Sequence, residues 1–529
     1  MKRIGWRRVA AAAVIGVLGV SAAALMKAVG DIDVPAPHAR VPLAAGGVRY
    51  EPTASSLNTH PLPAWFDDAK FGIFIHWGLF SIPGFAPNGS FEHVLRTDYD
   101  RAMLVHPYAE DYWNAIKDPS TPSAAFHRAH YGSMPYQGFK PLFEQRLRRW
   151  DPEAWARIFD EAGARYVVLV AKYHDGFCLW PTGVPNIHEQ EWFSTRDLVG
   201  ELASAVRARG LRFGVYYSGG VDWTFRPRIS RTLGDYGFST PGGDYPAYAD
   251  RQVRELIARY DPDILWNDIS WPTNGESLFR LFADYYSTEP HGVVNDRWSE
   301  ATIAGLVMRL KPARVLFDAL MKQAFIAKPD LLDEIGQQQV PHSDFVTPEY
   351  TQFKEIHPKK WEMTRGIGHS FGYNRNERDE DYASSESLLT SFIDAVAKNG
   401  NLLLNVGPRG DDMQVPPEQL TRLAAIGRWL RTNGRAIYGT RPWTRADTTT
   451  ASNEPVRFTR RGDRLFAIVI GRPTGSAITL KNVALAGDGR LLVDGSSVGI
   501  TVGAGSTVLT FAHPLDGAFA PAIEIGPLP

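Results

Sequence analysis

Short apolar segments alternate with amphipathic segments along most of this chain. Apolar runs of this kind predict strands that are buried on both faces. They cover residues 71–77, 165–172, 212–218, 263–268, 293–297, 369–374 and 401–406. Between them, apolar residues spaced three and four positions apart predict helices. These helices cover residues 153–162, 196–209, 248–260, 276–286, 384–398 and 418–432.

Regular strand–helix alternation predicts a parallel sheet covered by helices. The number of units favours an α/β fold in which the sheet closes into a TIM-like (β/α) barrel. A doubly wound open sheet is the alternative, but no glycine-rich phosphate loop follows any of the predicted strands. The first strand–helix connection, residues 78–151, is unusually long, and such long connections are often functional.

The pattern changes after residue 438, where short apolar strands are separated by Gly, Asp and Ser. This texture predicts an antiparallel β-sandwich. We therefore expect a signal peptide or membrane anchor at 1–30, a linker rich in Pro and Ala at 31–61, the barrel at 62–438 and the sandwich at 439–529.

The N-terminal segment combines Lys2, Arg3, Arg7 and Arg8 with an uncharged, mostly apolar stretch at 9–26. This is the form of a secretory signal, although the stretch is almost long enough to span a bilayer. Either interpretation predicts export, to the periplasm or the outside of the cell. A membrane contact is expected only through this segment.

Composition narrows the remaining classes of function. The net charge of −1 gives no overall attraction for nucleic acid. Cys178 is the only cysteine, so an intramolecular disulfide and a multi-cysteine metal site are excluded. No HExxH motif or Asp-rich loop predicts another metal site, and no G-x-S-x-G elbow predicts a serine hydrolase. We expect no cofactor.

Polar and aromatic residues gather where the predicted strands end. At the carboxyl ends of barrel strands, such groups form active sites, and this combination suits sugars. They include His76, Tyr173, His174, Trp266, Asp268, Arg297 and Phe371. Asp268 closes a buried strand and is our candidate nucleophile. Glycoside hydrolysis usually needs a second carboxyl group, and spacing alone leaves several candidates open. These are Glu110, Glu300, Glu334, Glu349 and Glu362.

Several ordered motifs closely resemble the α-L-fucosidases of glycoside hydrolase family 29. They are WF at 65–66, KFGIFIHWG at 70–78, HDGF at 174–177, RDL at 196–198, YYS at 216–218, LWND at 265–268, NDRW at 295–298, SFGYN at 370–374 and GNLLLNVGP at 400–408. The resemblance covers residues 62–475. It implies an enzyme that hydrolyses terminal α-L-fucosides, in glycans or small fucosides, with retention through a covalent glycosyl-enzyme intermediate.

The resemblance also assigns roles to individual residues. It makes Asp268 the nucleophile and Glu349 the acid/base. Residues at fucose-binding positions are His76, Glu110, Tyr173, His174, Trp266 and Arg297. It places Phe74, Tyr108 and Phe371 around the C6 methyl group, which distinguishes fucose from galactose.

Three features depart from the family pattern. Tyr173 stands where a first histidine is usual, Asp111 stands where tryptophan is common, and residues 299–344 form a longer connection that could act as a lid or an oligomer contact. These departures leave two alternatives open: the same chemistry on another fucose-like sugar such as an α-L-galactoside, or a barrel that binds glycans without hydrolysing them. Self-association into a homo-oligomer is a further prediction.

Overall fold

The computed structural model describes residues 43, 47–273, 275–299, 307–308, 310–328, 340–349 and 353–527. The predicted signal or anchor at 1–30 lies outside the described residues. In the part of the chain that is described, no helix is long and apolar enough to cross a membrane.

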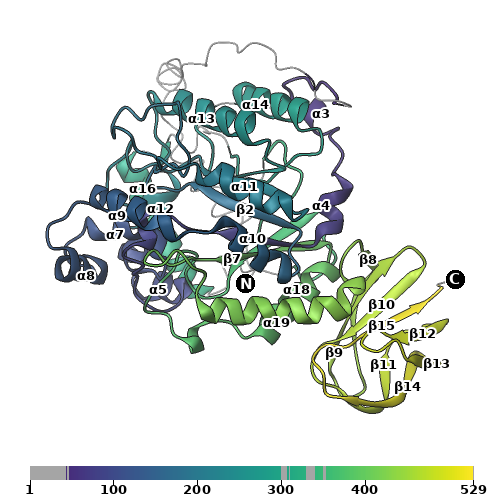
Figure 1. Ribbon diagram of the computed structural model, residues 1–529. Coiled ribbons are helices and arrows are strands. Elements are labelled where there is room, and N and C mark those ends of the chain that lie inside the picture. The colour runs from purple at the N-terminus through teal and green to yellow at the C-terminus, as the bar shows by residue number, and fades with distance from the viewer. Residues whose placement is uncertain are drawn as a thin grey trace, which may run out of the picture.

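Seven parallel strands form the sheet of the N-terminal domain (Figure 1). They are β1 (Phe71–Ile75), β2 (Tyr166–Lys172), β3 (Arg212–Ser218), β4 (Ile264–Asp268), β5 (Val293–Val294), β6 (Trp361–Gly366) and β7 (Gly400–Val406). Their order is β5-β4-β3-β2-β1-β7-β6. Nearly all of their residues are buried, because helices cover the outer face of the sheet. This arrangement confirms the predicted fold class.

Residues 344–349 connect the two edges of this sheet. The Asp344 N–H donates to the Val294 carbonyl of β5 at 2.9 Å. On the other side, isolated parallel bridges join Val346 to Trp361 and Glu349 to Thr364, both in β6. This irregular segment therefore takes the place of an eighth strand, and it delivers Glu349 to the same end of the sheet as Asp268.

Long helices follow the strands along the chain, and most of them pack on the outside of the sheet (Figure 1). They are α10 (Pro152–Glu161), α11 (Leu198–Ala208), α13 (Tyr245–Tyr260), α14 (Gly275–Thr288), α16 (Lys311–Ala327), α18 (Ser385–Ala397) and α19 (Pro417–Asn433). Local sequence sets several of their starts. Asp151 and Asp197 accept a backbone N–H at the beginnings of α10 and α11, and Pro152 occupies the first turn of α10.

Short helices fill the long connection between β1 and β2. They are α5 (Phe91–Thr97), α6 (Ala102–Val105), α7 (Tyr112–Ile116), α8 (Pro122–Tyr131) and α9 (Phe139–Arg146). Upstream of β1 lie α3 (Ala54–Leu57) and α4 (Ala64–Ala69), and a further short helix, α12 (Leu233–Gly237), follows β3. Leu57 and His60 are buried, so this part of the predicted linker packs on the barrel.

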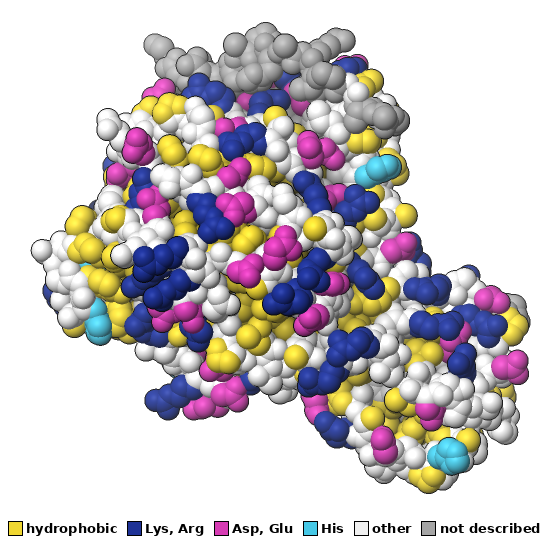
Figure 2. All heavy atoms as spheres, viewed as in Figure 1, with side chains coloured by type: hydrophobic (Ala, Val, Ile, Leu, Met, Phe, Trp, Pro, Cys, Tyr) yellow, Lys and Arg dark blue, Asp and Glu magenta, His cyan; other side chains and the backbone are white. Residues whose placement is uncertain are grey.

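The C-terminal domain is one antiparallel sheet of eight strands. They are β8 (Arg441–Thr449), β9 (Pro455–Arg461), β10 (Arg464–Val469), β11 (Thr474–Lys481), β12 (Asp488–Leu491), β13 (Ser497–Gly503), β14 (Ser506–Asp516) and β15 (Ala522–Gly526). The sheet curls around its own apolar core, and a bridge from Thr450 to Leu480 joins its ends. It forms a separate lobe (Figure 2) that lies beside α18 and α19 (Figure 1), where Trp429 Nε1 donates to the Ala520 carbonyl at 3.1 Å.

One predicted strand is wrong. Residues 369–374 form a loop, and the sixth strand is β6 at Trp361–Gly366. This strand carries Glu362 and Arg365, which interrupt the apolar pattern. Glu362 is nevertheless buried, and its burial is tolerated because Tyr166 and Trp266 donate hydrogen bonds to its carboxyl group.

Candidate active site

Asp268 is the last residue of β4 and lies at the carboxyl end of the sheet. Its side chain is 13% exposed. Tyr216 Oη donates to Asp268 Oδ2 at 2.9 Å, and Arg297 Nη1 donates to Oδ1 at 3.0 Å. The carboxylate is therefore held from two sides by donors, with its orientation fixed.

The backbone that follows Asp268 is strained. Ile269 has a φ of 68° and Ser270 a φ of 135°, both in the region that favours glycine. In this conformation the Ile269 N–H donates to Asp268 Oδ1 at 3.0 Å. Gly220 allows the turn to pack closely, because a Cβ at that position would lie 2.9 Å from the Ile269 carbonyl carbon. The strained turn thus adds a third donor to the candidate nucleophile.

Arg297 joins Asp268 to Glu349. The same atom, Nη1, lies 3.0 Å from Asp268 Oδ1 and 2.6 Å from Glu349 Oε1. These two carboxylate oxygens can therefore be no farther apart than the sum of the distances, about 5.6 Å. The guanidinium is fixed by Thr347, whose Oγ1 accepts from Nε at 3.0 Å and whose carbonyl accepts from Nη2 at 2.9 Å. Glu349 is the more open carboxylate, with 38% of its side chain exposed.

Burial and charge act in opposite directions on Asp268. Burial raises the pKa of its carboxyl group above the ordinary value, the Arg297 guanidinium opposes this rise, and the nearby Glu349 adds to it. The net direction is upward. Arg297 is thus the main group that favours the ionised form of Asp268, and the hydrogen bond from Tyr216 acts in the same direction.

His76 and His174 present bare nitrogens to the site. Asn405 Nδ2 donates to the Phe371 carbonyl at 2.6 Å, so Asn405 Oδ1 faces His76 Nδ1, also at 2.6 Å, and this nitrogen carries the proton. The tautomer of His174 follows in the same way: Ser218 Oγ donates to the Val221 carbonyl, so it accepts from His174 Nδ1, which carries the proton. In both rings Nε2 is then an acceptor.

Both imidazoles are neutral at physiological pH. Burial lowers the pKa of His76 to about 3, although the bond to Asn405 favours the charged form. Burial likewise lowers the pKa of His174 to about 3. Two neutral, oriented acceptors suit the hydroxyl groups of a sugar.

Aromatic rings form an apolar wall beside these acceptors. The Phe74 ring lies 4.6 Å from that of His76, and the Phe371 ring lies 5.1 Å from His76, measured between centroids. Tyr108 continues the wall at 5.7 Å from Phe371. Trp266 closes it at 5.2 Å from Phe74, with the Arg297 guanidinium 5.0 Å from its ring.

Glu110 and Asp111 lie beside the Phe371 end of this wall. The Gly372 N–H donates to Glu110 Oε2 at 2.8 Å. Burial and the neighbouring Asp111 raise the pKa of Glu110 to about 8, so its carboxyl group is mainly protonated at neutral pH. Tyr173 Oη donates to Asp111 Oδ1 at 3.0 Å. Tyr173 and Asp111, which both depart from the family pattern, are therefore hydrogen-bonded to each other.

The structure brings all the predicted site residues together at one end of the barrel. Of the other candidates for the second carboxylate, Glu300 and Glu334 lie outside the described residues. Glu362 lies beneath Trp266, whose Nε1 donates to it at 3.1 Å, and burial raises its pKa to about 7. Glu349 is the candidate among the described residues that shares a guanidinium with Asp268.

Sequence reasoning assigned no role to the residues that hold the site residues in their orientations. Tyr216, Ser218, Thr347 and Asn405 contact the predicted residues rather than the open space. Asn405 interrupts the apolar run of β7, and this polar residue in a buried strand was a usable signal. Thr347 had none, because its segment lacks a regular pattern.

Among the described residues, no group of three or more His, Cys, Asp or Glu side chains is placed to hold a metal ion.

A barrel with two carboxylates, oriented acceptors and an aromatic wall at its strand ends is typical of a glycoside hydrolase. Comparison with known proteins agrees with this class. The family model for alpha-L-fucosidase matches residues 41–435. The tissue alpha-L-fucosidase of Bos taurus is 32% identical over 444 residues, which cover 82% of this chain and 80% of the relative. The alpha-L-fucosidase of Dictyostelium discoideum is 31% identical over 413 residues, 75% of each chain.

Solved structures give the same result. A crystal structure of Thermotoga maritima alpha-fucosidase in complex with fucose is 40% identical to this chain, with a TM-score of 0.75. The match covers 90% of this chain and all of that one. The chain belongs to the alpha-L-fucosidase family of glycoside hydrolases, and it is an enzyme of that class.

Proposed function

We propose that this protein is an exported hydrolase that removes terminal α-L-fucose with retention of configuration, through a covalent intermediate on Asp268. One observation carries the proposal: a single nitrogen of Arg297 contacts both Asp268 and Glu349, so that their oxygens are at most about 5.6 Å apart. Retaining glycosidases hold their carboxyl groups about 5–5.5 Å apart, whereas inverting enzymes need about 6.5–9.5 Å.

The two carboxylates differ in the way this mechanism requires. Asp268, more buried and held by three donors, attacks the anomeric carbon and forms an ester as the glycosidic oxygen leaves. Glu349, more exposed, donates the proton that the leaving oxygen takes up. Glu349 then removes a proton from a water molecule, which attacks the ester and regenerates Asp268.

The remaining contacts support a fucose ligand. His76 and His174 accept from sugar hydroxyls through their bare Nε2 atoms, and the protonated Glu110 contributes a further polar contact. Phe74, Tyr108 and Phe371 suit the C6 methyl group. The expected substrates are fucosylated glycans or small fucosides.

The nucleophile is tested with Asp268→Gly and an aryl α-L-fucoside. We expect turnover to fall on the order of 10³-fold or more, because the covalent catalyst is lost. Added azide should restore product formation with inverted configuration, since a small anion can occupy the vacated position. Undiminished turnover in this variant would exclude Asp268 as the nucleophile.

The acid/base is tested with Glu349→Ala on a series of aryl fucosides. Leaving groups of high pKa need protonation more than those of low pKa, so the loss of kcat should be larger for the former. A uniform loss across the series would point to another acid. In the wild type, NMR of the first-formed fucose should show the α anomer.

An aryl α-L-galactoside tests the alternative substrate. The aromatic wall has few hydrogen-bond partners for the C6 hydroxyl group that galactose carries in addition. We therefore expect the fucoside to be preferred by about 10- to 100-fold. Preference for the galactoside would favour the alternative.

Export is supported by the basic and apolar pattern at 1–30, and mass spectrometry of the mature N-terminus distinguishes a cleaved signal from an anchor. Self-association stays a prediction.

A further inference from the structure

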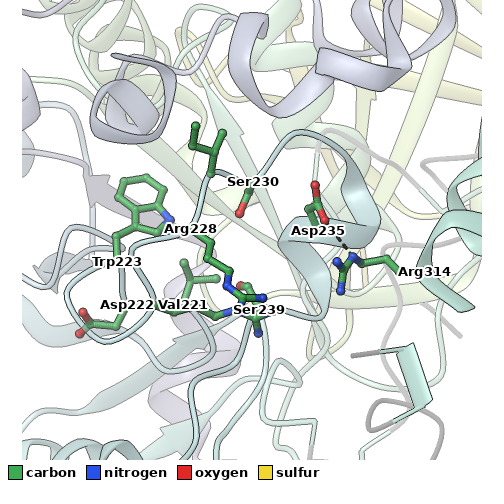
Figure 3. A pocket seen from close by; sticks show the side chains of 10 residues that line it. Val221, Asp222, Trp223, Arg228, Ser230, Asp235, Ser239 and Arg314 are labelled. Carbon is green, nitrogen blue, oxygen red and sulfur yellow. Dashed lines mark ion pairs between the residues drawn. The ribbon is translucent and has the colours of Figure 1, made fainter. Parts of the chain in front are cut away.

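A cavity of about 100 Å³ lies beside the sugar site. None of the residues assigned above to the sugar lines it. The lining comes from the loop after β3, from α12 and its flank, and from α16 (Figure 3), and it includes Asp222, Trp223, Arg228, Asp235, Ser239 and Arg314. A water molecule needs about 10–15 Å³ by this measure, so the cavity has room for several waters or for a small polyatomic ligand.

The cavity carries an excess of positive charge. Both of its carboxylates are paired: Asp222 lies 2.8 Å from Lys172 Nζ, and Asp235 lies 2.8 Å from Arg314 Nε. Arg228 also lines the cavity; it is an exposed residue at the cavity mouth, and its side chain has neither an ion pair nor a hydrogen bond within the described part of the chain. A cation that faces a polar cavity without a protein partner is a ready contact for an anion.

Two buried donors in the lining also lack partners. Trp223 Nε1 and Ser239 Oγ have no hydrogen-bond partner among the described residues, although the residues are only 2% and 6% exposed. In Figure 3 the nitrogen-bearing edge of the Trp223 indole is turned toward the other lining side chains. An unsatisfied buried donor is costly, and a ligand with acceptor atoms would remove this cost.

These donors select for one kind of ligand. Arginine and the indole N–H can only donate, and the serine hydroxyl can donate as well. A sulfate, carboxylate or phosphate group accepts at every oxygen and carries the complementary charge. We propose that this cavity binds a small oxyanion, either as the free ion or as an acidic substituent of the glycan from which fucose is removed.

The cavity shares a wall with the sugar site. The backbone N–H of Trp223 donates to the His174 carbonyl at 2.8 Å. The helix α12 carries Asp235 on the cavity side, while the next residue, Tyr236, packs against His174 with 5.4 Å between ring centroids. A bound anion would therefore lie next to the fucose, which makes acidic fucosylated glycans the expected substrates.

This arrangement also gives the long 299–344 connection a role. Its helix α16 supplies Arg314 to the cavity and holds α12 in place. Asp318 of α16 accepts from Thr232 Oγ1 at 2.8 Å and from the Gly234 N–H at 3.0 Å. Helix α16 thus contributes a side chain to the proposed anion site and positions α12 beside it.

The binding test is calorimetry with sodium sulfate at constant ionic strength, using the full-length protein. The wild type should bind sulfate, Arg228→Gln should bind about tenfold more weakly or worse, and Ser239→Ala several-fold more weakly. Arg428→Gln is the matched control, because Arg428 is an exposed arginine on α19 that does not line the cavity, and it should bind like the wild type.

Two results would overturn the proposal. One is a wild type that shows no heat of binding up to about 50 mM sulfate. The other is an equal affinity in Arg228→Gln and the wild type, which would mean nonspecific surface binding. Thermal melts without sulfate check that Ser239→Ala folds. Since calorimetry needs no turnover, its outcome is independent of the proposed fucosidase mechanism.

A second experiment identifies the source of the anion. It compares kcat/KM for a fucosylated disaccharide with and without a sulfate ester on the reducing sugar. If the substituent occupies the cavity, the wild type prefers the sulfated form, Arg228→Gln loses the preference, and free sulfate competes. If sulfate binds but both disaccharides react alike, the occupant is the free ion.

Discussion

Replacing Arg297 with methionine should move the acid limb of the pH–rate profile to higher pH. Arg297 Nη1 lies 3.0 Å from Asp268 Oδ1. At an effective dielectric constant of about 20, two unit charges at this distance attract by about 5.5 kcal/mol, which is a ceiling of about 4 pKa units. Since water can fill part of the space left by the guanidinium, we expect a shift of about 1–2 pH units.

The sign follows from the state that reacts. Asp268 must be ionised to attack, and loss of the nearby cation raises its pKa. Activity should therefore fall away at a higher pH than in the wild type, so Arg297→Met is most impaired in acid and recovers partly as the pH rises. The assay is kcat/KM for an activated aryl fucoside between about pH 4 and 9, because this ratio reports groups of the free enzyme.

Two controls separate charge from shape. Arg297→Lys keeps the cation and should shift the limb less than Arg297→Met. Thr347→Val removes one contact of the Arg297 side chain but leaves the guanidinium beside Asp268, so its acid limb should stay with that of the wild type. An acid limb that does not move in Arg297→Met, or that moves downward, would refute this account.

Three further predictions concern the groups around the reacting pair. Asn405→Leu removes the acceptor that orients His76, and it should raise KM about tenfold or more; unchanged KM would show that the imidazole needs no such partner. Glu362→Gln should flatten the pH dependence of stability. Burial raises the pKa of Glu362 to about 7, so between about pH 4.5 and 7 the folded protein keeps a proton that the unfolded chain releases. The wild type should therefore lose stability as the pH rises through this range. Urea titrations at several pH values would detect this loss. Phe371→Ala should narrow the preference for fucoside over galactoside in paired kcat/KM measurements, and an unchanged ratio would remove Phe371 from the methyl-binding wall.

The sequence predicted most of the barrel because its strands are buried on both faces and carry apolar runs. It failed at β6, where Glu362 is satisfied by Tyr166 and Trp266, residues distant in sequence. The apolar pattern also did not predict that residues 344–349 close the sheet, because they do so through isolated bridges rather than a regular ladder.

The candidate site was predictable where a residue stands at a strand end, as Asp268 and His174 do. Residues such as Ser218 and Asn405 act through a neighbour, and only three-dimensional contacts show which atom each one orients. The oxyanion cavity was beyond sequence reasoning for a different reason. Its donors come from three separate elements, and no spacing along the chain relates Trp223 to Arg314.

The strained turn after Asp268 places stability and activity in opposition at one position. An isoleucine with a φ of 68° costs on the order of 1–3 kcal/mol of folding free energy. Glycine at position 269 would relieve that cost and should raise Tm, while giving the nucleophile more freedom to leave its reactive orientation. A selection for heat resistance alone would therefore favour mutations here that make the enzyme slower. Efforts to stabilise this protein should leave the turn unchanged and act instead on the surface of the C-terminal lobe.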